Sequence, residues 1–558
     1  MATMLAPGLL EGGRWPVALA GAGLAAGLVL LIGARQGFAP VTMVIAGMLV
    51  GMTASAVATA MTLAQGEYLL SLVIWNGGAL VQQDWSGVRV LAGVLAFGAL
   101  AAAVLARPLR VLSLGVEGAS GLGLNVTGMR LLAVGVAVIL AAAVSAELGL
   151  IAFVGLAAPA LARSLGAVSI PRLLALSPLI GALILSLCDG LVLLVAGHVG
   201  EMFPTGALTG LIGGPLLIWL LPRLRGSTPP GTERAEGPAP RRDRTAPLLT
   251  GLAVTLVIAA LVLVWIGRVP GGWAILDAQS FAAFLPMRRP RLIAAASAGA
   301  ALAIAGAILQ RLTANPLASP EVLGVSGGAA MGYAGVVYLV AAPTAVALTT
   351  GTMAGGALAL ILIAAFVSRR DMPAERVLLA GIAVSVLASA VLSAAMAVGD
   401  MRSFQILAWL SGSSSTVTMP GALALAGVAV TLWAGALTAR RWLAVLPLGT
   451  GVAGGLGLPL RLTRMALIAL AGMATGAATV LVGPLSIVGL MAPHLARRLG
   501  LTRPGDHVTG AALIGAGLML AADFGARMAG FPYELPLGLF ASLIGAPWLI
   551  WLMMRPQR

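Results

Sequence analysis

The sequence predicts an all-α membrane protein that crosses the bilayer many times. Of its 558 residues, 60% are hydrophobic and only 9% are charged, whereas soluble domains carry about 25% charged residues. Apolar runs recur along the whole chain, and about 20 apolar residues in a helix span the hydrocarbon core. The runs lack the alternation of apolar and polar residues found in membrane β-barrels, so we expect each span to be a helix.

The charged residues exclude several classes of function. The net charge is +15, and the sequence contains arginine but no lysine. Arginine clusters mark the cytoplasmic loops of membrane proteins, so we expect no nucleic-acid binding. A nucleotide-binding P-loop requires a lysine, so ATP-driven transport would need a separate ATPase subunit and this chain would not be an enzyme. The single cysteine, Cys188, lies in an apolar run and predicts no disulfide framework.

An internal repeat organises the chain. The segment AELGLIAFVGLAAPALARSLG (146–166) matches VLVGPLSIVGLMAPHLARRLG (480–500), so that Gly155 pairs with Gly489 and Pro159 with Pro493, each 334 positions apart. The same offset relates many other positions, which indicates a tandem duplication. We divide the chain into an N-terminal repeat at 1–222, a flexible cytoplasmic linker rich in Pro, Gly and Arg at 223–244, and a C-terminal repeat at 245–558.

The two repeats differ in length at their N-terminal ends. The first repeat matches only from about residue 16 and has counterparts of the last seven segments, but nothing in it corresponds to 246–349. We therefore expect the first repeat to lack about three N-terminal helices, so that either the natural gene extends upstream of Met1 or the chain is an impaired truncation. The second repeat contains ten expected membrane segments: 246–267, 290–310, 324–342, 345–367, 376–399, 420–439, 465–482, a short one at 485–496, 507–529 and 536–555.

The stretch LQRLTANPLASPEVLGVSGGAAMG (309–332) interrupts two apolar runs of the second repeat. Asn315-Pro316 and Pro320 forbid a continuous helix, because proline lacks a donor and restrains the residue before it. We expect the chain to turn there and to re-enter the membrane at about Gly324, where the glycines that follow allow close helix packing in lipid.

Three sequence motifs distinguish the second repeat from other membrane segments. Arg288, Pro290 and Arg291 form an R-x-P-R entry to a Gly/Ala-rich helix that ends at Gln310, and the sequence N-P-L-A-x-P-x-x-L-G follows at 315–324, beginning with Asn315 and Pro316 and ending with Gly324. A second motif, G-P-x-x-F-x-G-L-x-x-P-H-x-x-R, includes Gly489, Pro493 and His494, with Ile487 where Phe is usual. The third, E-L-P-x-G, lies at 534–538. Together they resemble the permease subunits of ABC importers for iron–siderophore complexes and cobalamin. Most such permeases are single-copy homodimers, and the fusion of two copies resembles the ferric hydroxamate permeases.

The resemblance implies a coupling loop in each repeat, on which an ATPase subunit docks. Segments 113–130 and 447–464 share the pattern L-G-x-x-x-A-x-x-L-G. The family's acidic position is Glu117 in the first loop but Gly451 in the second, which leaves the ionic contact of the second loop open. An ordinary interfacial loop is the alternative in both places. The matching positions are Leu114, Gly115, Ala119, Leu122 and Gly123, and Leu448, Gly449, Ala453, Leu456 and Gly457.

Four charged residues are further candidates. The resemblance places Arg288 and Arg527 on the face opposite the coupling loops, where arginines of the family meet carboxylates of the substrate-binding protein; anchoring to lipid headgroups is the alternative. The first repeat has Leu193 at the position of Arg527. Asp189 and Asp523 occupy equivalent positions inside membrane segments, where a carboxylate is costly. Hydrogen bonding to a neighbouring helix explains them, and proton coupling is the alternative.

These features predict the permease subunit of an ATP-driven importer that takes up iron(III)-hydroxamate siderophores. Another iron chelate, haem or cobalamin is the alternative substrate, and a secondary transporter is less favoured because it has no use for a coupling loop. The expected partners are two copies of an ABC ATPase, a periplasmic or lipid-anchored siderophore-binding protein and membrane lipid, with the chain multi-pass in the inner membrane. We expect no cofactor and no metal site, since His494 has few potential companion ligands.

Overall fold

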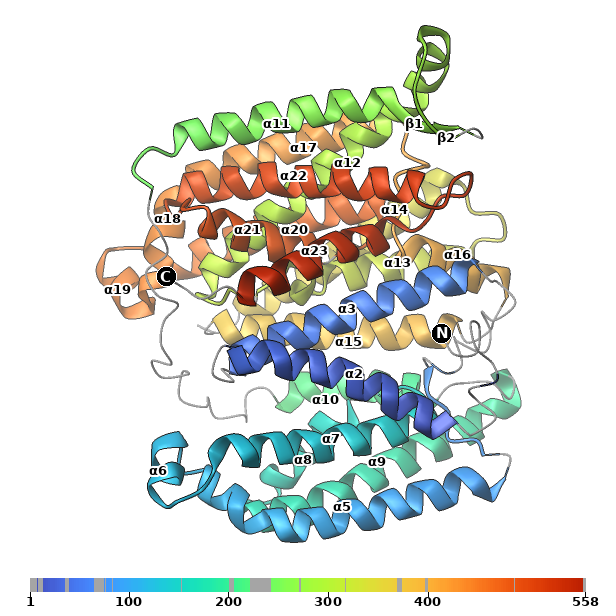
Figure 1. The fold of residues 1–558 in the computed structure, drawn as a ribbon, viewed down its shortest axis with the longest axis vertical. Coiled ribbons are helices and arrows are strands. Elements are labelled where there is room, and N and C mark those ends of the chain that lie inside the picture. The colour runs from blue at the N-terminus through green and yellow to red at the C-terminus, as the bar shows by residue number, and fades with distance from the viewer. Residues whose placement is uncertain are drawn as a thin grey trace. The chain divides into compact units, whose positions relative to one another are not determined.

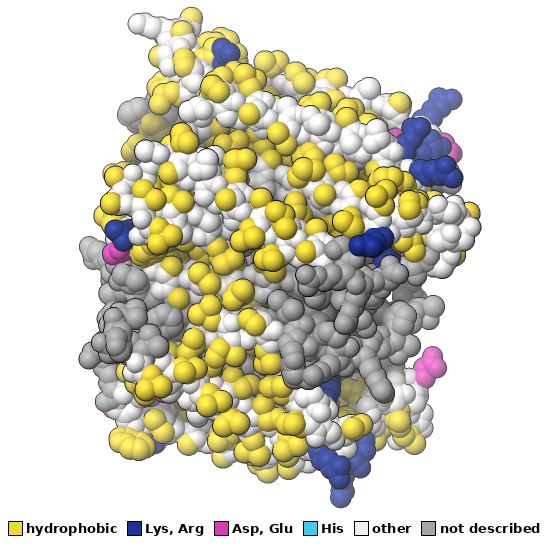
Figure 2. All heavy atoms as spheres, turned by 180° about the vertical axis from the view of Figure 1, so that it is seen from behind, with side chains coloured by type: hydrophobic (Ala, Val, Ile, Leu, Met, Phe, Trp, Pro, Cys, Tyr) yellow, Lys and Arg dark blue, Asp and Glu magenta, His cyan; other side chains and the backbone are white. Residues whose placement is uncertain are grey.

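The computed structural model describes the chain as a set of helices with one short hairpin (Figure 1). Within the described residues, 11 helices are long and apolar enough to cross a membrane by length and composition. Hydrophobic side chains are spread over the described part of the face shown in Figure 2, and the few charged groups lie near its edges, as expected for helices that face lipid. The described residues are 8, 14–35, 40–64, 75, 77–82, 84–151, 153–199, 205–220, 242–269, 272–316, 318–368, 374–396, 400–485 and 487–554.

The chain forms two compact units, and the limits of these units do not coincide with those of the sequence repeats. Unit 1 comprises Met1–Gly47, Gln65–Arg225 and Ser389–Ser403, and unit 2 comprises Met48–Ala64, Gly226–Ala388 and Phe404–Arg558. Each unit therefore includes one short segment from the other repeat. Most of the expected linker lies outside the described residues.

In unit 1, α7 packs against both α2 and α5, and α8 packs against α9 (Figure 1). Asn125 caps the start of α7 by accepting a hydrogen bond from the Gly128 amide at 2.9 Å, which satisfies one of the free donors at a helix N-terminus. The helices that contribute to this unit are α2 (Arg14–Arg35), the first part of α3 (Pro40–Ala64), α5 (Trp85–Leu112), α6 (Val116–Gly121), α7 (Val126–Leu148), α8 (Val154–Ser164), α9 (Ile170–Val199) and α10 (Thr205–Leu220).

In unit 2, α12 (Ala278–Leu312) is the central helix. It packs against α17, α20, α21 and α22, and nearly every residue from Leu292 to Leu312 is buried. The other elements are α11 (Ala246–Trp265), β1 (Ile266–Val269), β2 (Gly272–Ile275), the 3-10 turn η3 (Pro320–Leu323), α13 (Val325–Leu339), α14 (Ala345–Ser368), α15 (Ala374–Met396), which ends in unit 1, α16 (Met401–Leu410), α17 (Met419–Thr438), α18 (Arg440–Val445), η4 (Leu446–Leu448), α19 (Thr450–Gly455), α20 (Leu460–Val482), α21 (Ile487–Arg498), α22 (Pro504–Met528) and α23 (Leu537–Met554).

Each of the ten segments expected in the second repeat corresponds to a helix, but the structure adds three features. Helix α12 begins at Ala278, twelve residues before the expected start, because Asp277 caps it through the Ser280 amide at 3.1 Å. Strands β1 and β2 pair antiparallel, with Ile266 opposite Ile275. The Arg268 side chain ties this hairpin to the Met528 carbonyl at the end of α22. Helices α16 and α18, which lie between the expected segments, are the third addition.

The turn between α12 and α13 follows the prediction from its prolines. Helix α12 ends at Leu312, Ala314 takes a positive φ of 51°, and Gly324 takes a φ of 70° immediately before α13 begins. The glycines that follow bring α13 against α14: a Cβ on Gly332 would lie 2.0 Å from the Gly351 carbonyl oxygen, and one on Gly355 would lie 2.2 Å from the Gly328 carbonyl oxygen. The expected close packing is confirmed, since no larger residue fits at these positions.

Helix boundaries reproduce the sequence offset. Helices α6 and α19 begin at Val116 and Thr450 and have equal length, and α7 and α20 run over Val126–Leu148 and Leu460–Val482. All of these limits differ by the same 334 positions that relate Gly155 to Gly489. The same local sequence therefore encodes the same helix limits twice.

Candidate functional site

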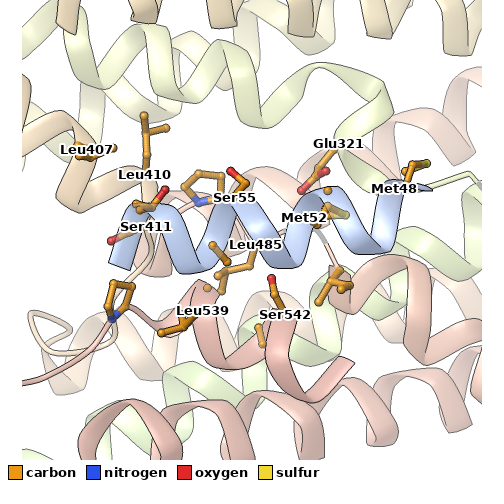
Figure 3. Close-up of a pocket in the computed structure, with 18 residues that line it drawn as sticks. Met48, Met52, Ser55, Glu321, Leu407, Leu410, Ser411, Leu485, Leu539 and Ser542 are labelled. Carbon is orange, nitrogen blue, oxygen red and sulfur yellow. The ribbon is translucent and has the colours of Figure 1, made fainter. Parts of the chain in front are cut away.

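A cavity of about 640 Å³ lies among helices of unit 2 (Figure 3). Its volume falls within the range of about 300–1,000 Å³ that is usual for small-molecule sites. Among the described residues the wall is mostly apolar, with hydroxyl groups from four side chains and one carboxylate. The lining residues are Met48, Gly51, Met52, Ser55, Ala56 and Thr59 from α3, Glu321 from η3, Leu407, Leu410 and Ser411 at the end of α16, Pro484, Leu485 and Ile487 before and in α21, and Pro536, Gly538, Leu539, Ala541 and Ser542 around the start of α23.

Backbone hydrogen bonds hold three of these lining segments together. The amides of Leu537 and Gly538 donate to the carbonyls of Gly412 and Ser411 at 3.1 and 3.0 Å, and the Ser413 amide donates to the Val482 carbonyl at 3.0 Å. A Cβ on Gly538 would lie 2.8 Å from the Ser411 oxygen. The glycine of the E-L-P-x-G motif is therefore required because two backbone segments meet there.

Glu321 is the ionisable group of this wall, and sequence reasoning did not select it. Figure 3 shows its carboxylate directed toward α3. Burial raises the pKa of the Glu321 carboxyl from its ordinary value of 4.5 to about 7, because a charge is disfavoured where water is excluded. The sequence contained one signal that could have identified it: Glu321 is the one acidic residue of 309–332.

The two expected coupling loops have the same backbone geometry, each within its own unit. Gly115 and Gly449 precede α6 and α19 with φ of 92° and 98°, and Gly123 and Gly457 follow them with φ of 82° and 77°. These positive angles favour glycine. The Leu124 amide donates to the Ala119 carbonyl at 3.1 Å, and the Leu458 amide makes the matching bond of 3.1 Å in the second loop.

The surfaces of the two loops also match. Ala119 and Ala453 are fully buried, whereas Leu114 and Leu122 are each 66% exposed. In the second loop Leu448 is 60% and Leu456 is 58% exposed. Each loop thus presents a pair of exposed leucines around a short helix. Glu117 is exposed, and Gly451 leaves the second loop without that charge.

An ion-pair network surrounds Asp523 near the end of α22. Asp523 is fully buried, and its Oδ2 accepts from Arg527 Nε at 2.9 Å. Its Oδ1 accepts from the Ser414 hydroxyl at 2.5 Å and lies 3.6 Å from Arg291 Nη2. Arg291 also pairs with Glu534 of the E-L-P-x-G motif. The network joins α12, the loop before α17, α22 and the loop before α23.

Asp189 in unit 1 has a simpler environment. It is half-buried and accepts one hydrogen bond, from the Thr205 hydroxyl at 3.2 Å. Leu193 stands where Arg527 stands in the second repeat. Both carboxylates are hydrogen-bonded to a neighbouring segment, as the first of the two sequence interpretations expects.

The arginines expected to dock a binding protein make contacts inside unit 2. Arg288 donates to the carbonyls of Val264 and Ile266 at 2.6 and 3.1 Å. The Arg527 guanidinium forms an ion pair with Asp523. Docking through either guanidinium would require these contacts to be exchanged, whereas the neighbouring Arg289 is exposed.

Comparison with known proteins defines the family. The family model described as the FecCD transport family matches residues 1–223 and 251–555. The chain belongs to this family. It is 40% identical to the iron(3+)-hydroxamate import system permease protein FhuB of Salmonella typhimurium, over 97% of this chain and 79% of that protein, and 39% identical to FhuB of Escherichia coli, over 93% and 78%.

Two further comparisons concern about half of this FecCD-family chain. The vitamin B12 import system permease protein BtuC of Escherichia coli is 36% identical over 55% of the chain and 94% of its own length. A metal-chelate type ABC transporter solved in an inward-facing conformation matches with a TM-score of 0.51 and 28% identity, over 56% of this chain and all of that chain.

The motif residues of this FecCD-family chain pack α12 against its neighbours. Gln310 is buried and its Nε2 donates to the Leu490 carbonyl at 3.1 Å. A Cβ on Gly306 would lie 1.7 Å from the Gly489 carbonyl oxygen, so α12 and α21 touch through their backbones. Between two of these neighbours, His507 Nε2 of α22 lies 2.9 Å from the Pro493 carbonyl oxygen of α21. Within the described residues no group of three His, Cys, Asp or Glu side chains is arranged to hold a metal ion.

Proposed function

We propose that this chain is the membrane permease of an ATP-driven importer for iron(III)-hydroxamate complexes. The similarity to FhuB over nearly the whole chain carries this proposal. The complex would pass from a siderophore-binding protein through the permease into the cytoplasm. The permease would lie in the inner membrane and consist of two fused repeats of the ten-helix plan, the first of which matches only part of that plan.

The paired loops support an arrangement with two ATPase subunits. Each loop carries two exposed leucines and two glycines with positive φ around a short helix. Two surfaces with one geometry suit two copies of one partner. In this proposal the ATPases bind Leu114, Leu122, Leu448 and Leu456, and the face that carries Arg288, Arg289 and Arg527 meets the binding protein through complementary charge.

The cavity of unit 2 supports transport of a bulky, weakly held ligand. It has hydroxyl donors at Ser55, Thr59, Ser411 and Ser542 and otherwise mostly apolar walls. Hydroxamate chelates expose polar amide and hydroxamate oxygens around a shielded iron, which such hydroxyls can contact without stripping the metal. A pathway must bind its cargo weakly enough to release it, and the few polar groups of this lining favour weak binding.

Uptake of radiolabelled iron tests the proposal. The chain would be expressed with its ATPase and binding protein in cells that lack their own hydroxamate and cobalamin permeases. We expect uptake of a tris-hydroxamate complex that disappears when the P-loop lysine of the ATPase is replaced. Uptake of radiolabelled cobalamin, measured in the same cells, would instead favour the function of BtuC, and uptake that survives loss of the ATPase would indicate a secondary transporter.

A further inference from the structure

The cavity of unit 2 contains a single ionisable side chain among its 18 described lining residues, namely Glu321. The others are apolar residues, glycines and the hydroxyl residues Ser55, Thr59, Ser411 and Ser542. None of these described lining residues is an arginine or a histidine. Among them, a ligand in this cavity therefore meets one negative group and no positive one.

Contacts with neighbouring segments anchor the turn that carries Glu321. The Glu321 carbonyl accepts hydrogen bonds from the Gly324 amide at 2.8 Å and from the Ser385 hydroxyl at 3.0 Å. Pro320, one residue before, lies against Gly489, where a Cβ would be 2.4 Å from the proline ring. The side chain projects from this anchored turn toward α3, as Figure 3 shows.

The carboxylate of Glu321 is not used in an ion pair within the described residues. The ion pairs of the network of Asp523, Arg291, Arg527 and Glu534 do not include Glu321. With no cationic partner among the described residues, the carboxylate directs its field into the cavity, where the effective dielectric constant is lower than in water.

We propose that Glu321 makes this cavity select iron(III) chelates by charge, admitting neutral and cationic hydroxamates and disfavouring anionic chelates. The inference rests on the proposed function, because it concerns the cargo of that same cavity. Singly charged hydroxamate groups neutralise iron(III) in a tris-complex. Doubly charged catecholate groups, or an added free carboxylate, leave the complex anionic. Like charges repel at short range, so selectivity arises from rejection of the wrong ligand.

A series of chelates that differ only in one terminal group tests the proposal. A linear trihydroxamate with a free terminal amine forms a cationic iron complex. Acetylation of the amine makes it neutral, and succinylation makes it anionic. Uptake of the three complexes would be measured with the same ATPase and binding protein for each permease variant. Because the binding protein is common, its own preference cancels when variants are compared.

Replacement Glu321→Gln removes the charge and keeps the shape. We expect the ratio of anionic to cationic uptake to rise roughly tenfold, the change that one like-charge contact in a partly hydrated cavity gives, with neutral uptake little changed. Glu321→Asp should retain most of the preference. The matched control is Asp277→Asn, which removes a carboxylate from the cap of α12 outside the cavity and should leave the ratio unchanged.

A second variant keeps the test decisive if Glu321→Gln fails to assemble. Ser55→Asp adds a carboxylate to the wall at α3 and should lower anionic uptake roughly tenfold relative to cationic uptake. An unchanged ratio in a folded Glu321→Gln or Ser55→Asp permease would overturn the inference. Absence of ATPase-dependent uptake of all three complexes by the unsubstituted permease would instead overturn the proposed function.

Discussion

The ion pair between Asp523 and Arg527 allows a quantitative prediction. Replacement Asp523→Asn keeps the size of the side chain and its acceptor for the Ser414 hydroxyl, but removes the negative charge. Arg527, only 7% exposed, then loses its counter-ion, and its Nη2 atom is already buried without a hydrogen-bond partner among the described residues. Arg291 keeps Glu534, so one buried cation is left unpaired.

The expected loss of stability follows from this one unpaired buried cation. Breaking a buried pair by removing one partner costs about 3–5 kcal/mol, because the remaining charge stays buried. The equivalent change Asp189→Asn is a matched control, since Asp189 is half-buried and makes one hydrogen bond, to Thr205. A hydrogen bond of that kind contributes about 0.5–1.5 kcal/mol. We therefore expect Asp523→Asn to be the more destabilising by about 2–4 kcal/mol.

A double-mutant cycle in detergent micelles measures this difference. Arg527→Leu reproduces the residue that the first repeat carries at Leu193, and combining it with Asp523→Asn removes both charges. The double variant should recover most of the loss seen with Asp523→Asn alone. The free energy of unfolding would be obtained by titration with a denaturing detergent. Equal stability of Asp523→Asn and the unsubstituted protein would mean that Asp523 is already neutral, which would refute the ion-pair reasoning and favour proton coupling.

Three other outcomes are expected. Replacing Gly123 or Gly457 by Arg should abolish ATPase-dependent uptake without loss of membrane insertion, because positive φ strains a non-glycine residue and the Arg side chain would obstruct the surface on which the ATPase docks; normal uptake by both variants would disprove the coupling assignment. Arg289→Glu should slow uptake more strongly at low salt, as a titration of uptake rate against ionic strength would reveal, and a salt-independent wild-type rate would exclude a docking role. The preference against anionic chelates should be about half of its maximum near pH 7, increase as the pH rises above 7 and weaken as it falls below 7, because burial raises the pKa of Glu321 to about 7 and protonation removes its charge; the pH profile of the uptake ratio should be flat in Glu321→Gln.

Much of the architecture could be predicted from the sequence. Hydropathy alone identifies the spans, since lipid requires long apolar helices. Pro316 and Pro320 prevent α12 from continuing, and this effect is local and does not depend on the tertiary structure. The glycines of the two coupling loops predict surface turns of equal shape, and these turns recur with the sequence offset. All of these features depend on local chemistry or on comparison of one segment with another.

The cavity and the Asp523 network depend on tertiary structure. Arg527 is one helical turn from Asp523, so their pairing had a sequence signal, but Arg291 lies on α12 and reaches Asp523 only because α12 packs against α22. The faces that line the cavity carry no sequence signature. In a membrane, the side of a helix that meets lipid and the side that meets protein are both apolar. Hydropathy therefore determines that each helix spans the bilayer, whereas side-chain packing decides which face turns inward and places Glu321 in the cavity wall.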